Sequence, residues 1–475
     1  MHIWVSRVSS APLFGCAAGA ALAVTYTLSP LTVWFTAAMV LIFGFLGRGL
    51  SGRERRWALG LLSLGLGLRL LALAGFFLFT MDADGSLAVM LPDEAYIARR
   101  SLWLRNIALG IPIATNDFVD AFNPFAESAI LYVLAYVQLL VGTAPYGIRL
   151  LSVALSLAAT VIFYKTVRPT FGAPASLIGL SAALFMPSAF VWSISTLKEP
   201  PYYFLSAVSL ACVVTAVRSR SKEVRIAAAV TGLAAVVVLG TVREASAIVV
   251  GAGMVMGGML TPLLRRPAFA AAALAIVLTA GTVAFTHSAV RQRGLRALQT
   301  AAVMHVGHVK TPGRAYKLLD PQFYTRLDQR DLNYGAAIRV MQSDALARYV
   351  IRAALSFVLV PLPWQVSSWS AAAYLPQQVL WAVMVVFALV GVVAGLRRDG
   401  LLTLILASTV LIAAAGVTLT SGNIGTFVRH RDMTLLYLVW LSGVGFWFAV
   451  QSVAARYTVR ERLGGAGAST ETCAS

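Results

Sequence analysis

The sequence predicts an all-α polytopic membrane protein with about 12 transmembrane helices, together with interfacial and re-entrant helices. Hydrophobic residues make up 59% of the 475 residues, and charged residues make up only 12%. That charged fraction is about half of what a soluble domain carries. An ordinary soluble globular protein is therefore excluded. The net charge of +19 falls mostly in short loops, so it indicates membrane topology and not a nucleic-acid partner.

Apolar runs of about 17 to 25 residues, long enough to cross the hydrocarbon of a bilayer, recur along the chain. A second run follows the first after only Ser29 and Pro30, so we interpret the first as a span and not as a cleaved signal peptide. Shorter apolar segments at 126–142 and 349–363 lie beside prolines, and we expect them to be re-entrant or surface-lying helices. The predicted spans are 10–28, 31–47, 57–80, 147–167, 174–195, 201–217, 226–242, 245–264, 268–286, 378–396, 400–419 and 433–451.

Basic residues in the short loops determine the predicted orientation. A cytoplasmic N-terminus, with 126–142 not crossing, puts the basic clusters of the short loops on the inner side. The same topology puts Asp93, Glu94 and Glu199 on the outer side. The predicted parts are an N-terminal hairpin (1–47), a membrane module (48–286) with an outer loop (81–146), a second outer loop (287–377), C-terminal transmembrane helices (378–455) and a cytoplasmic tail (456–475).

Two acidic motifs on the outer side supply the candidate catalytic residues Asp93, Glu94 and Glu199. Asp93 and Glu94 follow Pro92 at the predicted start of an amphipathic helix, with Asp93 as its N-cap, and Glu199 precedes a pair of prolines. Acids at such positions also complement the helix dipole, so capping alone is an alternative explanation. A carboxylate at a membrane surface can act as a general base, and two or three together could hold a divalent cation.

Cationic residues near the same face are candidate ligands of a phosphate group. Arg429, His430 and Arg431 occupy the last outer connection, against the positive-inside trend. An extended segment would point both arginines the same way, and guanidinium forks match phosphate oxygens. Pairing with Asp432 or with lipid headgroups is the alternative. The remaining candidates are Arg243, Lys198 and Arg69.

Two of these further cations, Arg243 and Arg69, have a structural alternative. Arg243 could form a local ion pair with Glu244. Arg69 lies inside a span, where a charge is costly in lipid, so it should face the protein interior or reach the interface. His305 and His308, with His287, do not predict a metal site, because no nearby acid completes a ligand set.

The order of these features resembles the GT-C superfamily of membrane glycosyltransferases. Arg69 in a span, then Pro92-Asp93-Glu94-Ala95-Tyr96, a surface helix, two spans and Glu199 follow the layout of the protein O-mannosyltransferases and the aminoarabinose transferase of lipid A. The resemblance implies that 48–286 is the GT-C-like catalytic module. It also implies that Asp93 and Glu199 match the family's first and second acids. Better-known members tend to have aspartate at the second position.

The resemblance implies an inverting glycosyltransferase, which we place in the inner membrane of a bacterium. No cofactor is predicted beyond a possible divalent cation. Such an enzyme would move a sugar from a polyprenyl phosphate or pyrophosphate to a glycan, lipid or protein acceptor on the extracytoplasmic face, in the building of the cell envelope and its polysaccharides. Two alternatives stay open. One is a polymerase or ligase of lipid-linked oligosaccharides, and the other is a flippase or transporter of lipid-linked sugars.

Overall fold

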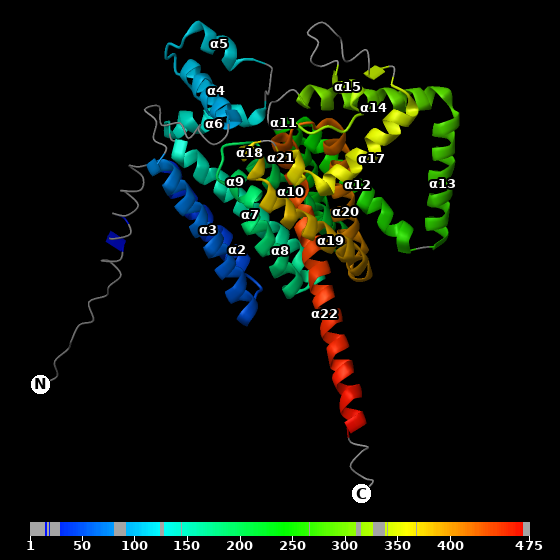
Figure 1. The fold of residues 1–475 in the computed structure, drawn as a ribbon. Coiled ribbons are helices and arrows are strands. Elements are labelled where there is room, and N and C mark those ends of the chain that lie inside the picture. Colours follow the sequence, from blue (N-terminus) through cyan, green and yellow to red (C-terminus); the bar gives the residue numbers. More distant parts are fainter. Residues whose placement is uncertain are drawn as a thin grey trace, which may run out of the picture. The chain divides into compact units, whose positions relative to one another are not determined.

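The computed structural model describes residues 15–16, 19, 29–79, 92–123, 128–143, 145–265, 267–309, 315–325, 338–339, 341–366 and 368–468. Within these ranges the chain is almost entirely helical, and its one β-bridge pairs Ala315 with Asn423. The all-α class predicted from the sequence is confirmed for this part of the chain. Figure 1 shows the helices coloured along the sequence.

Among the described residues, nine helices are long and apolar enough to cross a membrane. The pair α8 and α9, bent by 60° at their junction, would make a tenth span. The chain is therefore a multi-pass membrane protein. The predicted first span (10–28) lies almost wholly outside the described residues. The nine are α2 (Pro30–Gly47), α3 (Gly52–Phe79), α7 (Pro145–Phe171), α10 (Glu199–Arg218), α11 (Lys222–Val242), α12 (Glu244–Arg265), α19 (Leu375–Arg398), α20 (Gly400–Thr420) and α22 (Leu435–Ala468) with the preceding α21 (Ile424–Arg431) and η2 (Asp432–Thr434).

The remaining helices lie between these spans, and most of them are shorter or more polar than the nine. The apolar α6 has 13 residues and is about 20 Å long, which is too short to cross the hydrocarbon. The predicted span at 174–195 is divided between α8 and α9. These elements are α4 (Pro92–Ala108), α5 (Thr115–Ala121), α6 (Ala129–Val141), α8 (Ala173–Phe185), α9 (Pro187–Ser193), α13 (Pro267–Thr286), α14 (Ser288–Val309), α15 (Gln322–Thr325), α17 (Ser343–Leu359), η1 (Pro363–Gln365) and α18 (Trp369–Ala372).

The chain divides into two compact units. Unit 1 comprises 1–161, 190–204 and 241–243, and unit 2 comprises 162–189, 205–240 and 244–475. In unit 1, α2 packs on α3, and α4 packs on α5 and α6 around buried Ile97, Leu131 and Trp192. In unit 2, α12 packs on α20, and α22 packs on both α8 and α19. Unit 2 also has a cluster of buried apolar side chains, which joins α14, α17 and α21.

Glycines allow the helices of unit 2 to approach closely. A Cβ added to Gly257 of α12 would lie 2.5 Å from the Cα and the backbone nitrogen of Ile405 in α20. A Cβ on Gly391 of α19 would overlap the carbonyl oxygen of Leu441 in α22. Because lipid tails are as apolar as the side chains, helix association in a membrane depends on such close packing.

Replacing Gly257 with alanine should therefore destabilise unit 2. The neighbouring backbone of Ile405 cannot rotate away as a side chain can, so we expect a loss of roughly 1–3 kcal/mol. Gly258→Ala is the matched control, because its Cβ would meet nothing within 4 Å. In a helix it should stabilise by about 0.5–1 kcal/mol. Thermal unfolding in detergent measures both variants, and equal midpoints would show that the α12–α20 contact is not sterically tight.

Candidate functional site

The first acidic motif lies in the first turn of α4 in unit 1. The helix begins at Pro92, so the predicted N-cap role of Asp93 is wrong, and both acids are inside the helix. Successive residues of a helix point about 100° apart. Asp93 is consequently exposed, whereas the Glu94 side chain is buried.

Glu94 ties α4 to two other parts of unit 1. Its Oε1 lies 2.9 Å from Nη1 of Arg149 in α7. The same oxygen accepts hydrogen bonds from the backbone nitrogen of Thr196 at 2.6 Å and from its hydroxyl at 3.1 Å. Arg149 also donates to the carbonyl of Ile194 at 3.0 Å. The buried pair therefore fixes α4 against the turn between α9 and α10.

Glu199 follows that turn as the first residue of α10 and is also buried. It pairs with Nη2 of Arg243 at 3.1 Å. The sequence left open a local pair between Arg243 and Glu244, and the structure instead pairs Arg243 with the second candidate acid. Lys198 is half-buried in the same turn. Unit 1 thus contains all five of these candidates. Asp93 and Glu94 lie on α4, Lys198 lies just before Glu199 at the start of α10, and Arg243 lies in segment 241–243.

Arg69 of α3 faces the interior of unit 1, one of the two placements expected for it. Its Nε donates to the Ser193 hydroxyl at 2.7 Å, and its Nη1 donates to the Gly65 carbonyl at 2.9 Å. The guanidinium lies 4.9 Å from the ring centroid of Phe190. These contacts attach α3 to α9, just before the turn that Glu94 holds.

Two of the three candidate acids form buried ion pairs, and the third is exposed. Glu94 is neutralised by Arg149, and Glu199 is neutralised by Arg243. Asp93 is the exposed carboxylate of the motif. It is the most accessible of the three candidate acids.

The second candidate cluster lies in unit 2, on α21. This segment is helical, because the Asn423 side chain accepts from the backbone nitrogens of Gly425 and Thr426 and so caps it. The predicted extended segment is therefore wrong. In a helix Arg429 and Arg431 point about 200° apart, so they cannot form one clamp. Arg431 is buried, whereas Arg429 and His430 are half-buried.

The guanidinium of Arg431 is only partly satisfied. Its Nη1 donates to the Val360 carbonyl and to Oε1 of Gln378, both at 2.8 Å. Its face lies 4.3 Å from the ring centroid of Trp381. Its Nε and Nη2 are buried and have no hydrogen-bond partner within the described residues. Burying donors without partners is costly, so these two nitrogens favour an incoming acceptor.

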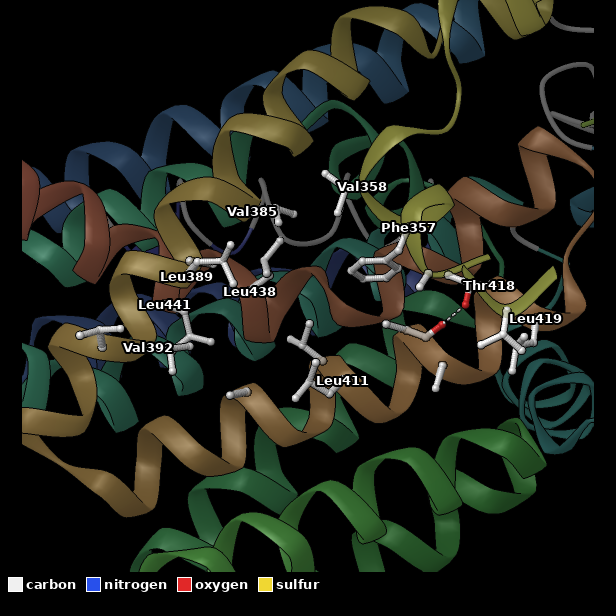
Figure 2. A pocket seen from close by; sticks show the side chains of 18 residues that line it. Phe357, Val358, Val385, Leu389, Val392, Leu411, Thr418, Leu419, Leu438 and Leu441 are labelled. Atoms are coloured by element: carbon white, nitrogen blue, oxygen red, sulfur yellow. Dashed lines mark hydrogen bonds between the residues drawn. The ribbon is translucent and has the colours of Figure 1, made fainter. Parts of the chain in front are cut away.

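An apolar groove of about 810 Å³ runs between α17, α19, α20 and α22 in the same unit. Figure 2 shows valine and leucine side chains lining it from Val392 to Leu419. Phe357, which lines the groove, packs against Trp381 with ring centroids 5.4 Å apart. The Arg431 guanidinium lies over the ring of the same Trp381. The pair Phe357 and Trp381 therefore separates the groove from the buried cation.

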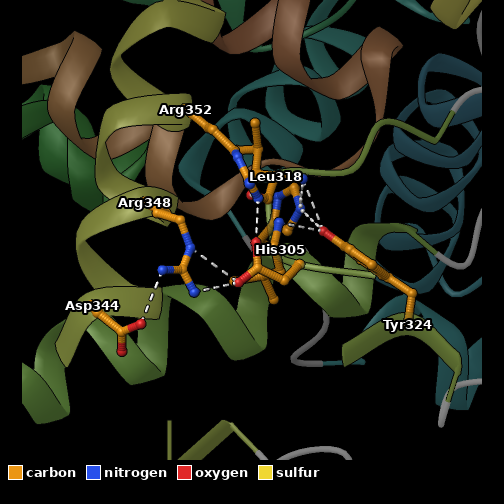
Figure 3. A network of polar contacts seen from close by, with 8 residues as sticks. His305, Leu318, Tyr324, Asp344, Arg348 and Arg352 are labelled. Carbon is orange, nitrogen blue, oxygen red and sulfur yellow. Dashed lines mark hydrogen bonds and ion pairs between the residues drawn. The ribbon is translucent and has the colours of Figure 1, made fainter. Parts of the chain in front are cut away.

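The predicted second outer loop contributes a buried polar network to unit 2 (Figure 3). Both ring nitrogens of His305 are engaged, Nδ1 with the Ser421 carbonyl at 2.6 Å and Nε2 with the Tyr324 hydroxyl at 3.0 Å. Tyr324 in turn accepts from the backbone nitrogens of Leu318 and Leu319, each at 2.9 Å. No group of three or more His, Cys, Asp and Glu residues suited to a metal ion occurs among the described residues.

The contacts of His305 determine its protonation. Nδ1 faces a carbonyl and donates to it. The Tyr324 hydroxyl accepts from two backbone nitrogens, so its own proton goes to Nε2 and the ring is neutral. Burial lowers the pKa of His305 from 6.5 to about 4; the bond to Ser421 raises it and nearby His308 lowers it. Beside this network, Arg348 and Arg352 hold the pKa of Asp320 below its usual value, chiefly through the Arg348 hydrogen bond.

His305 should make the protein sensitive to acid. Its folded pKa is below its unfolded value, so its contribution is fully present above pH 6.5 and is lost as the pH falls toward 4. Between pH 7 and pH 5 the loss should be about 2 kcal/mol. His305→Gln keeps a donor and an acceptor but does not titrate, so its thermal midpoint should fall less. An equal fall in this variant and in the His308→Gln control would contradict the assignment.

Several site residues were not identified from the sequence. Arg149 looked like an ordinary residue at the start of a span, and Gln378 and Trp381 looked like residues of an apolar one. The charge of Arg149 in a span was a usable signal, because such charges need partners. The groove had no signal, since its lining residues are those of any lipid-facing helix.

Comparison of the chain with protein-family models, with curated proteins and with solved structures finds no match.

Proposed function

We propose that the protein is a membrane glycosyltransferase that takes a sugar from a polyprenyl phosphate or pyrophosphate. The observation that carries this proposal is the partly satisfied Arg431, one aromatic pair from a long apolar groove. A lipid phosphate combines an apolar chain with an anion, and these two features of unit 2 suit its two parts. The enzyme acts in a bacterial inner membrane, with its active site on the extracytoplasmic face.

The lipid chain occupies the groove, and the phosphate approaches Nε and Nη2 of Arg431. Arg431 is closed to solvent here, and its Nη1 holds the Val360 carbonyl. Donor binding therefore requires the segment at Val360 to move. Once the phosphate is bound, a fixed guanidinium in a dry site stabilises the charge that develops on the leaving group.

We propose the exposed Asp93 as the group that receives the acceptor's proton, on its exposure and its place in the first acidic motif. An acceptor hydroxyl or amine attacks the anomeric carbon, and the bond from that carbon to the phosphate oxygen breaks with its electron pair on the phosphate. Attack opposite the leaving group inverts the configuration. Glu94 keeps α4 in place through Arg149 and Thr196, so it is a positioning residue for Asp93.

Donor binding and turnover test this function in the purified full-length protein. Saturable binding of a polyprenyl phosphate hexose is expected, and Arg431→Lys should weaken it by roughly tenfold or more, because lysine offers no fork. Arg429→Lys is the matched control and should bind as the wild type does. Asp93→Asn should keep donor binding but lose roughly 10²-fold or more in sugar transfer.

A groove-filling variant separates donor binding from folding defects at the buried arginine. Ala414 lines the groove and is half-buried, so Ala414→Trp should block the lipid chain without disturbing the core. Gly416→Trp on the same helix lies outside the groove lining and should bind normally. Absence of saturable binding by the wild type, or normal binding by Ala414→Trp, would refute the proposed donor site.

A further inference from the structure

A second cavity of unit 2, about 690 Å³ in volume, lies at the far ends of its spans. On α19 the groove lining ends at Val393 and the lining of the second cavity begins at Leu396, about 5 Å further along the helix, and the two cavities share no lining residue. The cavity forms where α10 and α19 end and α20 begins. Its principal lining residues are Arg218, Arg397, Arg398, Asp399, Leu396 and Leu401.

The cavity carries excess positive charge. Arg218 pairs with Asp399 and also donates to the Thr170 hydroxyl at 3.2 Å. Arg398 donates to the Phe171 carbonyl at 2.7 Å, which leaves its charge uncompensated. Arg397 makes no hydrogen bond or ion pair within the described part of the chain. Three arginines and one aspartate give a formal charge of +2.

The combination of walls and charge points to one class of ligand. Leucines beside the arginines provide an apolar wall, and a free phosphate ion would make no use of it. The ends of membrane spans lie at headgroup depth, and this end carries the basic short loops that the sequence places in the cytoplasm. Anionic phospholipids are enriched at that surface and bind basic pockets between helices.

We propose that this cavity binds the phosphate headgroup of an anionic phospholipid, with Arg397 and Arg398 as its principal ligands. Arg218 is held by Asp399 and shapes the cavity wall. The lipid's acyl chains lie along Leu396 and Leu401. The site is separate from the proposed donor groove and does not depend on sugar transfer.

Thermal stabilisation of the full-length protein by lipids in detergent tests the site. Phosphatidylglycerol should raise the unfolding midpoint more than phosphatidylcholine with the same chains, and sn-glycerol 3-phosphate at equal concentration should have little effect. Arg397→Gln should weaken the apparent affinity for phosphatidylglycerol by roughly tenfold. Because Arg397 has no partner to lose, this variant should fold normally.

Arg225→Gln is the matched control, since it removes an exposed basic residue of the same predicted face outside the cavity. It should respond to phosphatidylglycerol as the wild type does. Equal affinity of Arg397→Gln and Arg225→Gln would overturn the assignment of the cavity. Equal stabilisation by both lipids, or full competition by glycerol phosphate, would overturn the anionic phospholipid as its ligand.

Discussion

The buried ion pair between Glu94 and Arg149 is the constraint on which the candidate site of unit 1 depends. Two charges removed from water are stable only when they meet each other and when their remaining polar atoms are bonded. Here the Thr196 backbone and hydroxyl and the Ile194 carbonyl complete the set. The pair consequently joins α4, α7 and the turn before α10. It gives the exposed Asp93 a fixed support, and it places Glu199 next in the chain after the same turn.

In unit 2 the packing between helices is mainly apolar, and a buried charge there is only partly satisfied. Its spans approach through glycines, and the groove between α17, α19, α20 and α22 is lined almost wholly by apolar side chains. Against that background, the two unpartnered nitrogens of Arg431 are an unusual cost. A lipid phosphate would remove that cost, while the arginine pair at the far end of α19 suits the headgroup of an ordinary membrane lipid. We therefore propose a different kind of phosphate ligand for each of these two sites.

Composition and apolar run length were enough to predict an all-helical, multi-pass membrane protein, because spanning a bilayer restricts both. They missed the break between α8 and α9, although Pro187 is the first residue of α9 and a proline favours a helix end at the residue before it. The acidic motifs were found because charges are rare in such a chain. Their division into an exposed Asp93 and a buried Glu94 depended on the partner Arg149, distant in sequence. Arg429 and Arg431 were misread as one clamp because the cap made by Asn423 turns the segment into a helix.

A double-mutant cycle on Glu94 and Arg149 tests the support of α4 most directly. Glu94→Gln alone should destabilise the protein by about 3–5 kcal/mol, because it leaves the Arg149 charge buried without its partner. Arg149→Met alone should have a similar effect, because it leaves the Glu94 charge buried without its partner. The double variant should lose much less than the sum of the two, since no uncompensated charge remains. Thermal unfolding in detergent gives all four stabilities, and additive losses would contradict a coupled pair that holds α4 in place.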